Sequence, residues 1–548
     1  MAAVSGRKTQ QRSRGPVLTV DSSIKERTTH RLLERRAEQY GNRDFLFFKD
    51  EVWGLEDFDR EASKVAAGLQ ALGITKGDKV AVMLKNRPEY LFAWFGINKL
   101  GAVEVPINPA HKGELLTHML NLADCRVLFL QREFVDQIAT VQEDLTTLES
   151  YVCLDGAEGD IGLGGLPCTT YAALVDNDRR FDAPDVIWSD PFAIMFTSGT
   201  TGPSKGVLLP HNYPIMLAEL FTGMAEYVES DRLYVPLPYF HGHAMVASTL
   251  PALLCGGSIV VAERFSVSQT WDDIRRYGCT GFNYTGAMTA MLMKAEPKPD
   301  DSDNPIRVMC GGGTAPAVLP LFEERFDVTL VEGTYGTTEI GLPTICSLED
   351  RRQGVASRRN PNCEVKLVDD NGFEVGPNTQ GEMLVRPLQP YCMMLEYYNM
   401  PEETVTAWRD LWYHTGDYLS VDEKGVYSFV DRKKDALNRR GENISSFEVE
   451  RGVASHEAVL QSAAVAVKSD LGGDEVLVCV VCKPGQQLNA EELIAHCEDR
   501  MARFMVPRYV RFMDELPKTP TERVRKHLLR DEGITPDTWD REKGANVG

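Results

Sequence analysis

The stretch Phe192-Ala-Ile-Met-Phe-Thr-Ser-Gly-Thr-Thr-Gly-Pro-Ser-Lys-Gly206 begins as an apolar run and becomes a loop of hydroxyl residues and glycines. The run from Phe192 to Phe196 has the length and composition of a buried strand. Glycines let successive backbone N–H groups converge on an anion, hydroxyl groups add donors, and Lys205 adds a positive charge. The stretch therefore predicts a strand followed by a polyphosphate-binding loop.

A flexible Ser/Gly connector is the alternative interpretation of this loop. Connectors of that kind rarely follow a buried strand or end in Pro-Ser-Lys-Gly, so the turn chemistry favours a binding site. The loop does not match the pattern G-x-x-x-x-G-K-[ST], because Gly206 follows Lys205 where serine or threonine should stand. A P-loop kinase or GTPase is therefore not predicted.

The composition bounds the class of protein. A chain of 548 residues is too long for one hydrophobic core, so several domains are expected. The net charge of −21 argues against a nucleic-acid partner but leaves anionic substrates open. The twelve cysteines show no repeating spacing, which indicates reduced thiols and a cytoplasmic enzyme. Cys479-Val-Val-Cys482 lies in an apolar run, which favours a buried strand over a redox or zinc pair.

No transmembrane segment is predicted. The longest apolar tract without charge, residues 244–262, is divided by Pro251 and Gly256-Gly257, so a buried helix followed by a strand is expected. Residues 1–15 are basic and lack an apolar core, which excludes a secretory signal. They are interpreted as a flexible extension, and a mitochondrial-type presequence is the alternative.

Helix-like and strand-like segments alternate from about residue 28 to residue 130. Residues 79–84 have the pattern of a buried strand, and residues 89–97 that of a helix. Such alternation predicts an α/β fold with parallel sheets flanked by helices. Strand-like segments lie closer together from residue 363 to about 430, with turn signals between them, which indicates a small antiparallel β region. A further α/β segment is expected from about residue 435 to 530.

Two further motifs combine glycine with a carboxylate. Tyr335-Gly-Thr-Thr-Glu339 follows an apolar strand, and a carboxylate beside a polyphosphate suits Mg²⁺, which prefers hard oxygen ligands. Tyr413-His-Thr-Gly-Asp417 is interpreted as a glycine turn whose acid accepts hydrogen bonds from ribose hydroxyls, with a plain Asp-capped turn as the alternative. The charge run Asp431-Arg-Lys-Lys-Asp435 alone would indicate a solvated surface.

In this order, these stretches resemble the adenylate-forming superfamily of acyl- and aryl-CoA synthetases, nonribosomal adenylation domains and firefly-type luciferases. The resemblance covers about residues 28 to 530 and is carried by the phosphate loop, the motifs ending at Glu339 and Asp417, and Asp431-Arg432. It implies an α/β fold with a large N-terminal domain of two αβ subdomains plus a small β-barrel, and a smaller mobile C-terminal α+β domain. The implied division is an extension at 1–27, an N-terminal domain at 28–433 and a C-terminal domain at 434–548.

The resemblance implies an AMP-forming acid–thiol ligase. A carboxylate attacks the α-phosphate of ATP–Mg²⁺ to give acyl-AMP and pyrophosphate, the C-terminal domain swings, and the CoA thiolate displaces AMP. ATP, Mg²⁺ and coenzyme A are the implied cofactors, and a homodimer is one expected assembly. The run from Phe429 to Ser445 is most similar to the branch that contains carnitine- and betaine-CoA ligases.

The resemblance also implies roles for individual residues. The phosphates would be held by Thr197, Ser198, Gly199, Thr200, Thr201, Gly202 and Lys205. The magnesium ligands would be Thr197 and Glu339. The nucleotide would further contact Gly312, Gly313, Thr314, Gly333, Thr334, Tyr335, Gly336, Thr337 and, at the α-phosphate, Thr338. The ribose would be bound by Asp417 and Arg432, Lys434 would be the hinge, and Gly441 would lie beside the pantetheine tunnel.

One position in the sequence restricts the kind of carboxylic acid that the enzyme would activate. His241 stands where amino-acid-activating relatives carry an aspartate that grips the substrate amine, which favours an acid without a free α-amino group. A pair of structural histidines at His241 and His243 is the alternative. The residues expected to line the acyl pocket mix aromatic and polar groups, which suits a short or medium acid: His241, Met245, Asn283, Tyr284, Thr285, Gly336 and Leu342.

The C-terminal motif departs from the family pattern Pro-Lys-Thr-x-x-Gly-Lys. Glu522 and Arg523 occupy its last two positions, where the family lysine bridges the substrate carboxylate and the α-phosphate. Arginine keeps the charge but presents a larger planar fork. Three explanations are open. Arg523 takes the role of the family lysine with reduced or altered adenylation, or Lys518 or Lys526 takes that role instead. In the third, the chain is an altered form of a parent that carries the lysine. An acyl-AMP-forming enzyme with a non-CoA acceptor and a weakly catalytic nucleotide- or acyl-binding relative are the alternative functions.

Overall fold

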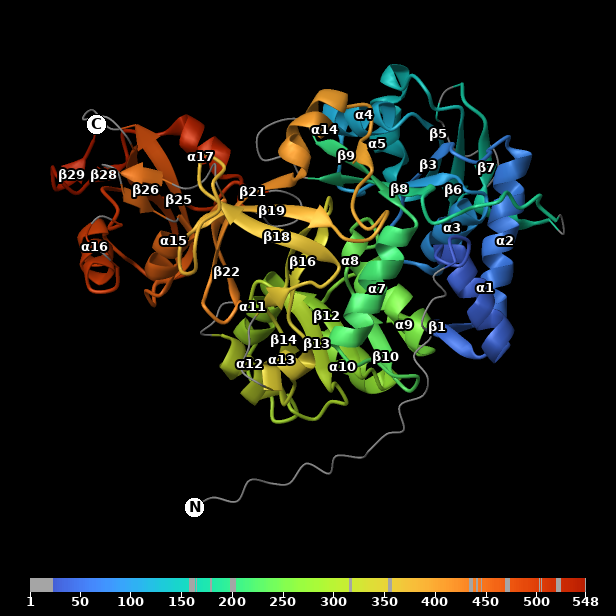
Figure 1. Ribbon diagram of the computed structural model, residues 1–548, viewed down its shortest axis with the longest axis horizontal. Coiled ribbons are helices and arrows are strands. Elements are labelled where there is room, and N and C mark those ends of the chain that lie inside the picture. The colour runs from blue at the N-terminus through green and yellow to red at the C-terminus, as the bar shows by residue number, and fades with distance from the viewer. Residues whose placement is uncertain are drawn as a thin grey trace, which may run out of the picture. The chain divides into compact units, whose positions relative to one another are not determined.

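The computed structural model describes residues 23–156, 163, 165–177, 180–197, 204–314, 318–352, 357–432, 437–439, 442–444, 446–468, 474–501, 503, 505–518 and 524–547. The chain forms two compact units, and Figure 1 shows the helices and strands of the chain. The first combines residues 1–196, 206–355 and 390–399, and the second combines residues 197–205, 356–389 and 400–548. The domain boundary expected at 433/434 falls inside the second unit and stays a prediction.

An eight-stranded sheet carries the phosphate-loop motif. Its order is β20-β9-β8-β4-β3-β5-β6-β7, and β20 pairs with β9 in the antiparallel sense. The strands are β3 (Lys79–Met83), β4 (Val103–Pro106), β5 (Cys125–Gln131), β6 (Ser150–Leu154), β7 (Cys168–Thr170), β8 (Pro191–Thr197), β9 (Lys205–Pro210) and β20 (Glu396–Tyr397). From β3 to β8 every pairing is parallel, and β4 is buried along its whole length, as expected for a sheet covered on both faces.

Helices cover this sheet closely. The first are α1 (Thr29–Tyr40), α2 (Leu55–Ala71), α3 (Pro88–Lys99), α4 (Gly113–Leu122), η1 (Arg132–Phe134), α5 (Val135–Ala139), η2 (Gln142–Asp144) and α6 (Tyr171–Val175). Apart from Glu89, α3 is buried throughout. A Cβ at Gly96 would lie 2.7 Å from the carbonyl oxygen of Ala62, so the approach of α3 to α2 requires glycine there.

The first unit also contains a seven-stranded sheet, whose strand order is β14-β13-β12-β10-β11-β1-β2. Its strands are β1 (Asp44–Phe48), β2 (Glu51–Gly54), β10 (Arg232–Val235), β11 (Ser258–Val261), β12 (Gly281–Thr285), β13 (Val308–Gly312) and β14 (Leu330–Val331), and only β2 is antiparallel. The apolar tract at 244–262 forms α8 (Gly242–Ala244), the π-helix η3 (Met245–Thr249), α9 (Leu250–Cys255) and then β11, which confirms helix followed by strand. Among the described helices, none is long and apolar enough to cross a membrane.

Two other sheets, of four and five strands, lie in the second unit. The antiparallel region, expected as a small barrel, is a four-stranded sheet of β18 (Cys363–Val368), β19 (Gly381–Pro387), β21 (Tyr413–Val421) and β22 (Tyr427–Arg432). The other sheet joins β25 (Val459–Lys468), β26 (Asp474–Cys482), β27 (Tyr509–Phe512), β28 (Trp539–Asp540) and β29 (Ala545–Asn546). Cys479 lies fully buried in β26, which confirms the strand predicted for the C-x-x-C run.

The remaining described elements are helices and strands outside these four sheets. They are α7 (Asn212–Met224), α10 (Thr270–Tyr277), α11 (Gly286–Lys294), α12 (Leu319–Phe326), β15 (Tyr335–Thr337), β16 (Gly341–Ile345), α13 (Leu348–Arg352), β17 (Arg358–Arg359), α14 (Pro401–Ala407), η4 (Arg409–Leu411), β23 (Leu437–Arg439), β24 (Glu442–Ile444), α15 (Ser446–Ala454), α16 (Ala490–Glu498) and α17 (Lys526–Glu532). Gly341 opens β16 with a φ of 66°, which favours glycine at this turn.

Replacing Leu411 with asparagine is expected to stabilise the second unit. Leu411 has a left-handed φ of 62° and its side chain is 81% exposed, so its backbone is strained without compensating burial. The left-handed conformation costs about 1–2 kcal/mol for an ordinary residue and less for asparagine, so we expect Leu411→Asn to raise the free energy of unfolding by about 1 kcal/mol. Denaturant unfolding measures the change. Val405→Asn, an exposed site inside α14, should instead destabilise, and equal effects would contradict the strain.

Acidification is expected to destabilise the first unit through His211. Burial lowers the pKa of His211 to about 3, whereas an unfolded histidine titrates near about 6.5. The unfolded chain therefore binds the extra proton first, and stability is lost as the pH falls from about 6.5 toward the folded pKa. Between pH 7 and pH 5 this histidine should remove about 2 kcal/mol from the free energy of unfolding. His211→Gln should flatten the pH dependence by that amount, and an unchanged slope would refute the assignment.

Candidate active site

The phosphate-loop motif begins and ends on neighbouring strands of the eight-stranded sheet. Phe192 to Met195 are buried in β8, as predicted, and the loop positions Ser198, Gly199, Thr200, Thr201 and Gly202 lie outside the described residues. At the base of the loop, the Ser204 hydroxyl donates to the carbonyl oxygen of Thr197 at 2.5 Å. Lys205 then opens β9. The structure thus brings the two ends of the motif together.

Lys205 is paired with a carboxylate that the sequence did not single out. Its ammonium lies 2.6 Å from Glu403 Oε2, within the second unit, and both side chains are partly exposed. Glu403 stands in the first turn of α14, after Pro401. In the sequence, acidic residues after a proline indicate only a helix start, so no local signal connects Glu403 to a lysine 198 positions earlier.

Glu339 lies in the turn between β15 and β16 and is held from β20. The Tyr397 hydroxyl donates to Glu339 Oε1 at 2.9 Å, and the backbone N–H of Met394 donates to the Glu339 carbonyl oxygen at 2.8 Å. Burial, and then the charge of Glu339, raises the pKa of the neighbouring Tyr213. The expected metal ligand is therefore a carboxylate held by Tyr397 and close enough to Tyr213 to affect its pKa.

Glu332 joins the loops expected to surround the adenine. Its Oε1 accepts the backbone N–H of Thr314 at 3.1 Å, and its Oε2 accepts the Tyr284 hydroxyl at 2.5 Å. These contacts connect the carboxyl ends of β12, β13 and β14, where open α/β sheets bind their ligands. A Cβ at Gly311 would lie 2.3 Å from the Tyr284 carbonyl oxygen, so the strands require glycine here. Glu332 has no signal in the sequence, because a lone acid after a strand belongs to no motif.

Two groups of contacts involve residues expected around the acyl group. Asn283 is fully buried, and its amide nitrogen donates to the carbonyl oxygen of Ala247 at 2.7 Å and to Ser248 Oγ at 3.0 Å. It thereby fixes the π-helix η3, which begins at Met245, and short π-helical turns are frequent at functional sites. Elsewhere, a Cβ at Gly336 would meet Leu342 Cδ2 at 2.8 Å, so those two positions adjoin.

The histidines of the motif around residue 241 are neutral at pH 7. Burial, and then the proximity of His111, lowers the pKa of His241 to about 4. Burial, and then His241, lowers the pKa of His243 to about 4. His243 also packs against Phe221, with ring centroids 5.9 Å apart. His243 therefore has the environment of a structural histidine, and His111 is a neighbour of the expected pocket that no motif indicated.

The two expected ribose ligands face one another in the second unit. Asp417 on β21 is the register partner of Arg432 on β22, and Arg432 Nε lies 3.6 Å from Asp417 Oδ1. The motif ending at Asp417 was interpreted as a turn, but the whole of it lies in β21. Gly416, at a φ of 67°, sits within the strand, where the pairing with β19 is irregular. A glycine at an irregularity resembles a turn signal in the sequence.

The adjoining charge run is not simply a solvated surface. Asp431 is buried, and its Oδ1 accepts the backbone N–H of Arg432 at 2.7 Å while its Oδ2 accepts that of Ser446. The hinge position Lys434 and the tunnel glycine Gly441 lie outside the described residues. Two backbone N–H groups therefore account for burying the Asp431 charge.

Arg523 also lies outside the described residues, but its flanks are described. Lys518 and Val524 form an antiparallel bridge, and Arg525 N–H donates to the Pro517 carbonyl oxygen at 2.7 Å. The Lys526 ammonium lies 2.8 Å from Glu450 Oε1 and 2.5 Å from Ser446 Oγ. Lys526 is therefore already committed within the second unit, which weighs against its substituting for the family lysine.

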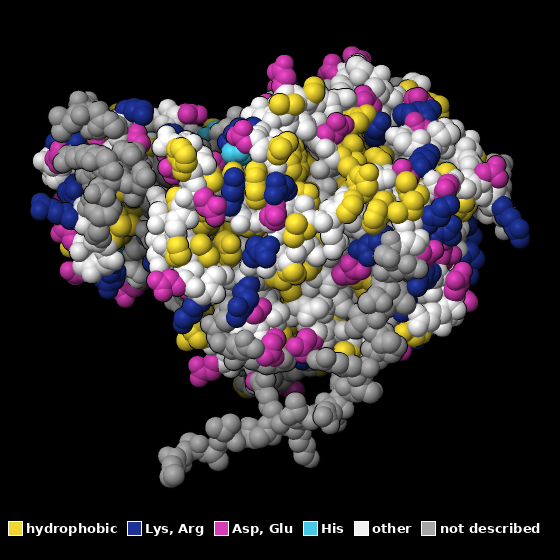
Figure 2. Space-filling model, viewed as in Figure 1, with side chains coloured by type: hydrophobic (Ala, Val, Ile, Leu, Met, Phe, Trp, Pro, Cys, Tyr) yellow, Lys and Arg dark blue, Asp and Glu magenta, His cyan; other side chains and the backbone are white. Residues whose placement is uncertain are grey.

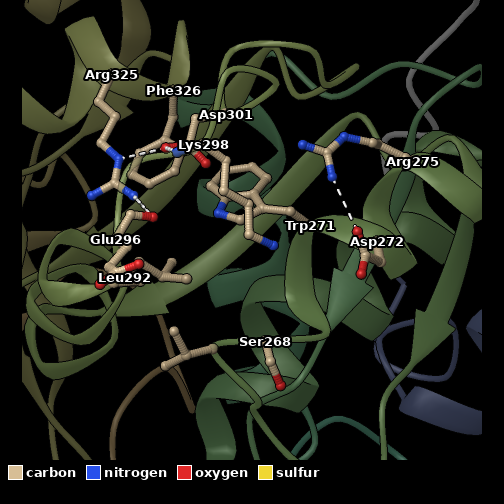
Figure 3. Close-up of a pocket in the computed structure, with 12 residues that line it drawn as sticks. Ser268, Trp271, Asp272, Arg275, Leu292, Glu296, Lys298, Asp301, Arg325 and Phe326 are labelled. Carbon is tan, nitrogen blue, oxygen red and sulfur yellow. Dashed lines mark hydrogen bonds and ion pairs between the residues drawn. The ribbon is translucent and has the colours of Figure 1, made fainter.

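A hollow between α10, α11 and α12 contains none of the expected site residues (Figure 3). Trp271 stacks on Phe326 at 4.6 Å along it. Arg325 donates to Asp301 at 2.7 Å and to the Met293 carbonyl oxygen at 3.0 Å. Its guanidinium is therefore occupied by the protein itself. On the face in view, Figure 2 shows acidic and basic side chains interspersed, without a basic patch among the described residues.

Comparison with known proteins identifies the family of this chain. The profile of the AMP-binding enzyme family matches residues 33–398, and that of the AMP-binding enzyme C-terminal domain matches residues 448–523. A crotonobetaine/carnitine–CoA ligase of Salmonella paratyphi B is 29% identical over 503 residues, 90% of this chain and 96% of the relative. The chain belongs to the AMP-binding enzyme family.

Solved structures of CoA ligases have the same fold as this chain. An anthranilate CoA ligase, AuaEII, in complex with anthranoyl-AMP is 26% identical with a TM-score of 0.82, covering 92% of this chain and 97% of that one. ATP-bound MatB from Rhodopseudomonas palustris shares the fold at 23% identity and a TM-score of 0.80, over 92% and 98% of the two chains. The fold class and the expected enzyme class, an AMP-forming acyl-CoA synthetase, are confirmed, and the alternative functions are not favoured.

Proposed function

We propose that this enzyme activates a short or medium carboxylic acid without a free α-amino group and transfers it from acyl-AMP to CoA. The observation that supports the nucleotide site most directly is the Glu332 contact. It gathers the Gly312–Thr314 and Gly333–Tyr335 segments at the carboxyl ends of three parallel strands. ATP, Mg²⁺ and CoA are the cosubstrates of the enzyme class.

The remaining roles belong to the same proposal. Thr197 and Glu339 offer a hydroxyl and a fixed carboxylate, which are the hard oxygen donors that Mg²⁺ takes. When bound, the ion would neutralise phosphate charge. Asp417 and Arg432 would bind the ribose, and Thr338 and Lys205 the phosphates. Lys434 would be the hinge between domains at 28–433 and 434–548, with Gly441 beside the pantetheine.

The choice of acid is supported by the neutral His241 and by the relatives. A neutral imidazole offers no counter-ion to a second carboxylate, so monocarboxylic acids are favoured over dicarboxylic acids. The relatives named above act on crotonobetaine or carnitine and on anthranilate, so quaternary-ammonium acids and small aromatic acids are the first candidates. A cytoplasmic location and a homodimer complete the proposal, and light scattering tests the assembly.

An acid panel tests the proposed function. The enzyme is incubated with ATP, Mg²⁺, CoA and each acid, while AMP and pyrophosphate are followed separately. Formation of both products with a short or medium acid supports the proposal. Pyrophosphate without AMP turnover would indicate a stalled adenylate and a different acceptor. Bound nucleotide without either product would contradict the proposal and identify a binding protein.

A further inference from the structure

Tyr397 forms a hydrogen bond with Glu339 that no sequence motif predicts. It stands on β20, more than fifty residues beyond Glu339, and its side chain is only 5% exposed. Its hydroxyl donates to Glu339 Oε1 at 2.9 Å. Among the described residues, no hydrogen bond to Glu339 Oε2 is present. The contact therefore fixes the carboxylate through one oxygen and leaves the other without a hydrogen bond from the described residues.

The backbone of the same segment holds Glu339 a second time. Met394 N–H donates to the Glu339 carbonyl oxygen, so the segment holds both the main chain and the side chain of the acid. Tyr397 is also the register partner of Val207 on β9, two residues after Lys205. β20 thus links the position of Glu339 to the strand that leaves the phosphate loop.

We propose that Tyr397 is a positioning residue for the magnesium site, acting through Glu339. The inference rests on the proposed metal role of Glu339. Groups that hydrogen-bond to a metal ligand fix its orientation, and removing one commonly weakens metal affinity or activity by about 10- to 100-fold. A carboxylate relieved of Tyr397 would rotate about its terminal torsion, so the second oxygen would no longer be aimed at the ion.

Tyr397→Phe tests the inference, with Tyr398→Phe as a matched control. The Tyr398 hydroxyl donates to Asp124 Oδ2 at 3.0 Å, so the control also removes a tyrosine–carboxylate hydrogen bond from the same segment. Mn²⁺ binding to the full-length enzyme with α,β-methylene-ATP is measured by electron paramagnetic resonance. Tyr397→Phe should raise the Mn²⁺ dissociation constant about tenfold. In pyrophosphate release, the Mg²⁺ concentration for half-maximal rate should rise similarly, while the rate at saturating Mg²⁺ changes little.

The outcomes separate the inference from the proposed function. If wild-type enzyme binds no nucleotide-dependent Mn²⁺, the metal role of Glu339 fails and the inference fails with it. If wild-type enzyme binds Mn²⁺ but Tyr397→Phe behaves like Tyr398→Phe, only the positioning role is overturned. A double variant guards against a folding defect. Adding Tyr397→Phe to Glu339→Gln should cause no further loss of Mn²⁺ affinity, and an additive loss would show that Tyr397 acts elsewhere.

Discussion

Glu339→Gln is expected to lower the rate of pyrophosphate release at least about tenfold, equivalent to about 1.4 kcal/mol of transition-state stabilisation. Glutamine preserves the shape of the side chain and can still accept the Tyr397 hydrogen bond, so the substitution removes charge rather than packing. A neutral amide oxygen is a weaker ligand for a hard divalent cation. The loss should be partly relieved by raising Mg²⁺, because the defect lies in holding the ion.

Asp124→Asn is the matched control for Glu339→Gln. Asp124 accepts the hydroxyl of Tyr398 and belongs to no expected motif, so its loss of charge should leave pyrophosphate release unchanged. The thioester half-reaction, started from supplied acyl-AMP and CoA, should be preserved in both variants. Adenylation close to the wild-type rate in Glu339→Gln would remove this residue from the magnesium role.

Sequence patterns located the strands and motifs well, because local chemistry determines them. The apolar run 192–196 could only be a buried strand before a glycine loop, and it is β8. Alternation of helix and strand indicated parallel sheets, and both large sheets are mainly parallel. The residues that face each other across β21 and β22, Asp417 and Arg432, were both identified, although their antiparallel register was not.

The contacts that shape the site were beyond sequence reasoning, because they join distant segments. Glu332, Tyr397 and Glu403 carry no motif of their own, and the side chain of each contacts at least one predicted residue. Asn283 shows how packing adds to a prediction. Its place in the acyl pocket stays a prediction, and in the structure its amide nitrogen donates to Ala247 and Ser248 of the π-helix η3. Residue chemistry restricts possible roles, and tertiary packing decides among them.

Arg523→Lys is expected to raise the adenylation rate, by up to about a hundredfold if the guanidinium is misplaced by about 1 Å. In the adenylate-forming superfamily, which the chain resembles, a lysine at this position bridges the substrate carboxylate and the α-phosphate. Its charge matters most as negative charge develops on that phosphate. The structure argues against the alternative that Lys526 replaces the family lysine, because the Lys526 ammonium is held by Glu450 and Ser446. Arg523 is therefore the cation to test first.

The half-reactions distinguish this role from a general effect on stability. In the resembling family the thioester step uses the other domain pose, with this residue turned away, so its rate should stay within about a factor of three in Arg523→Lys. Arg523→Ala should lower adenylation below the level of the arginine enzyme, because no cation then meets the developing charge. If Arg523→Lys slows adenylation, arginine is the adapted residue and the site has been rebuilt around its planar fork. If neither substitution changes the rate, the working cation lies elsewhere. Lys518, whose backbone bridges to Val524 beside Arg523, then becomes the next position to replace.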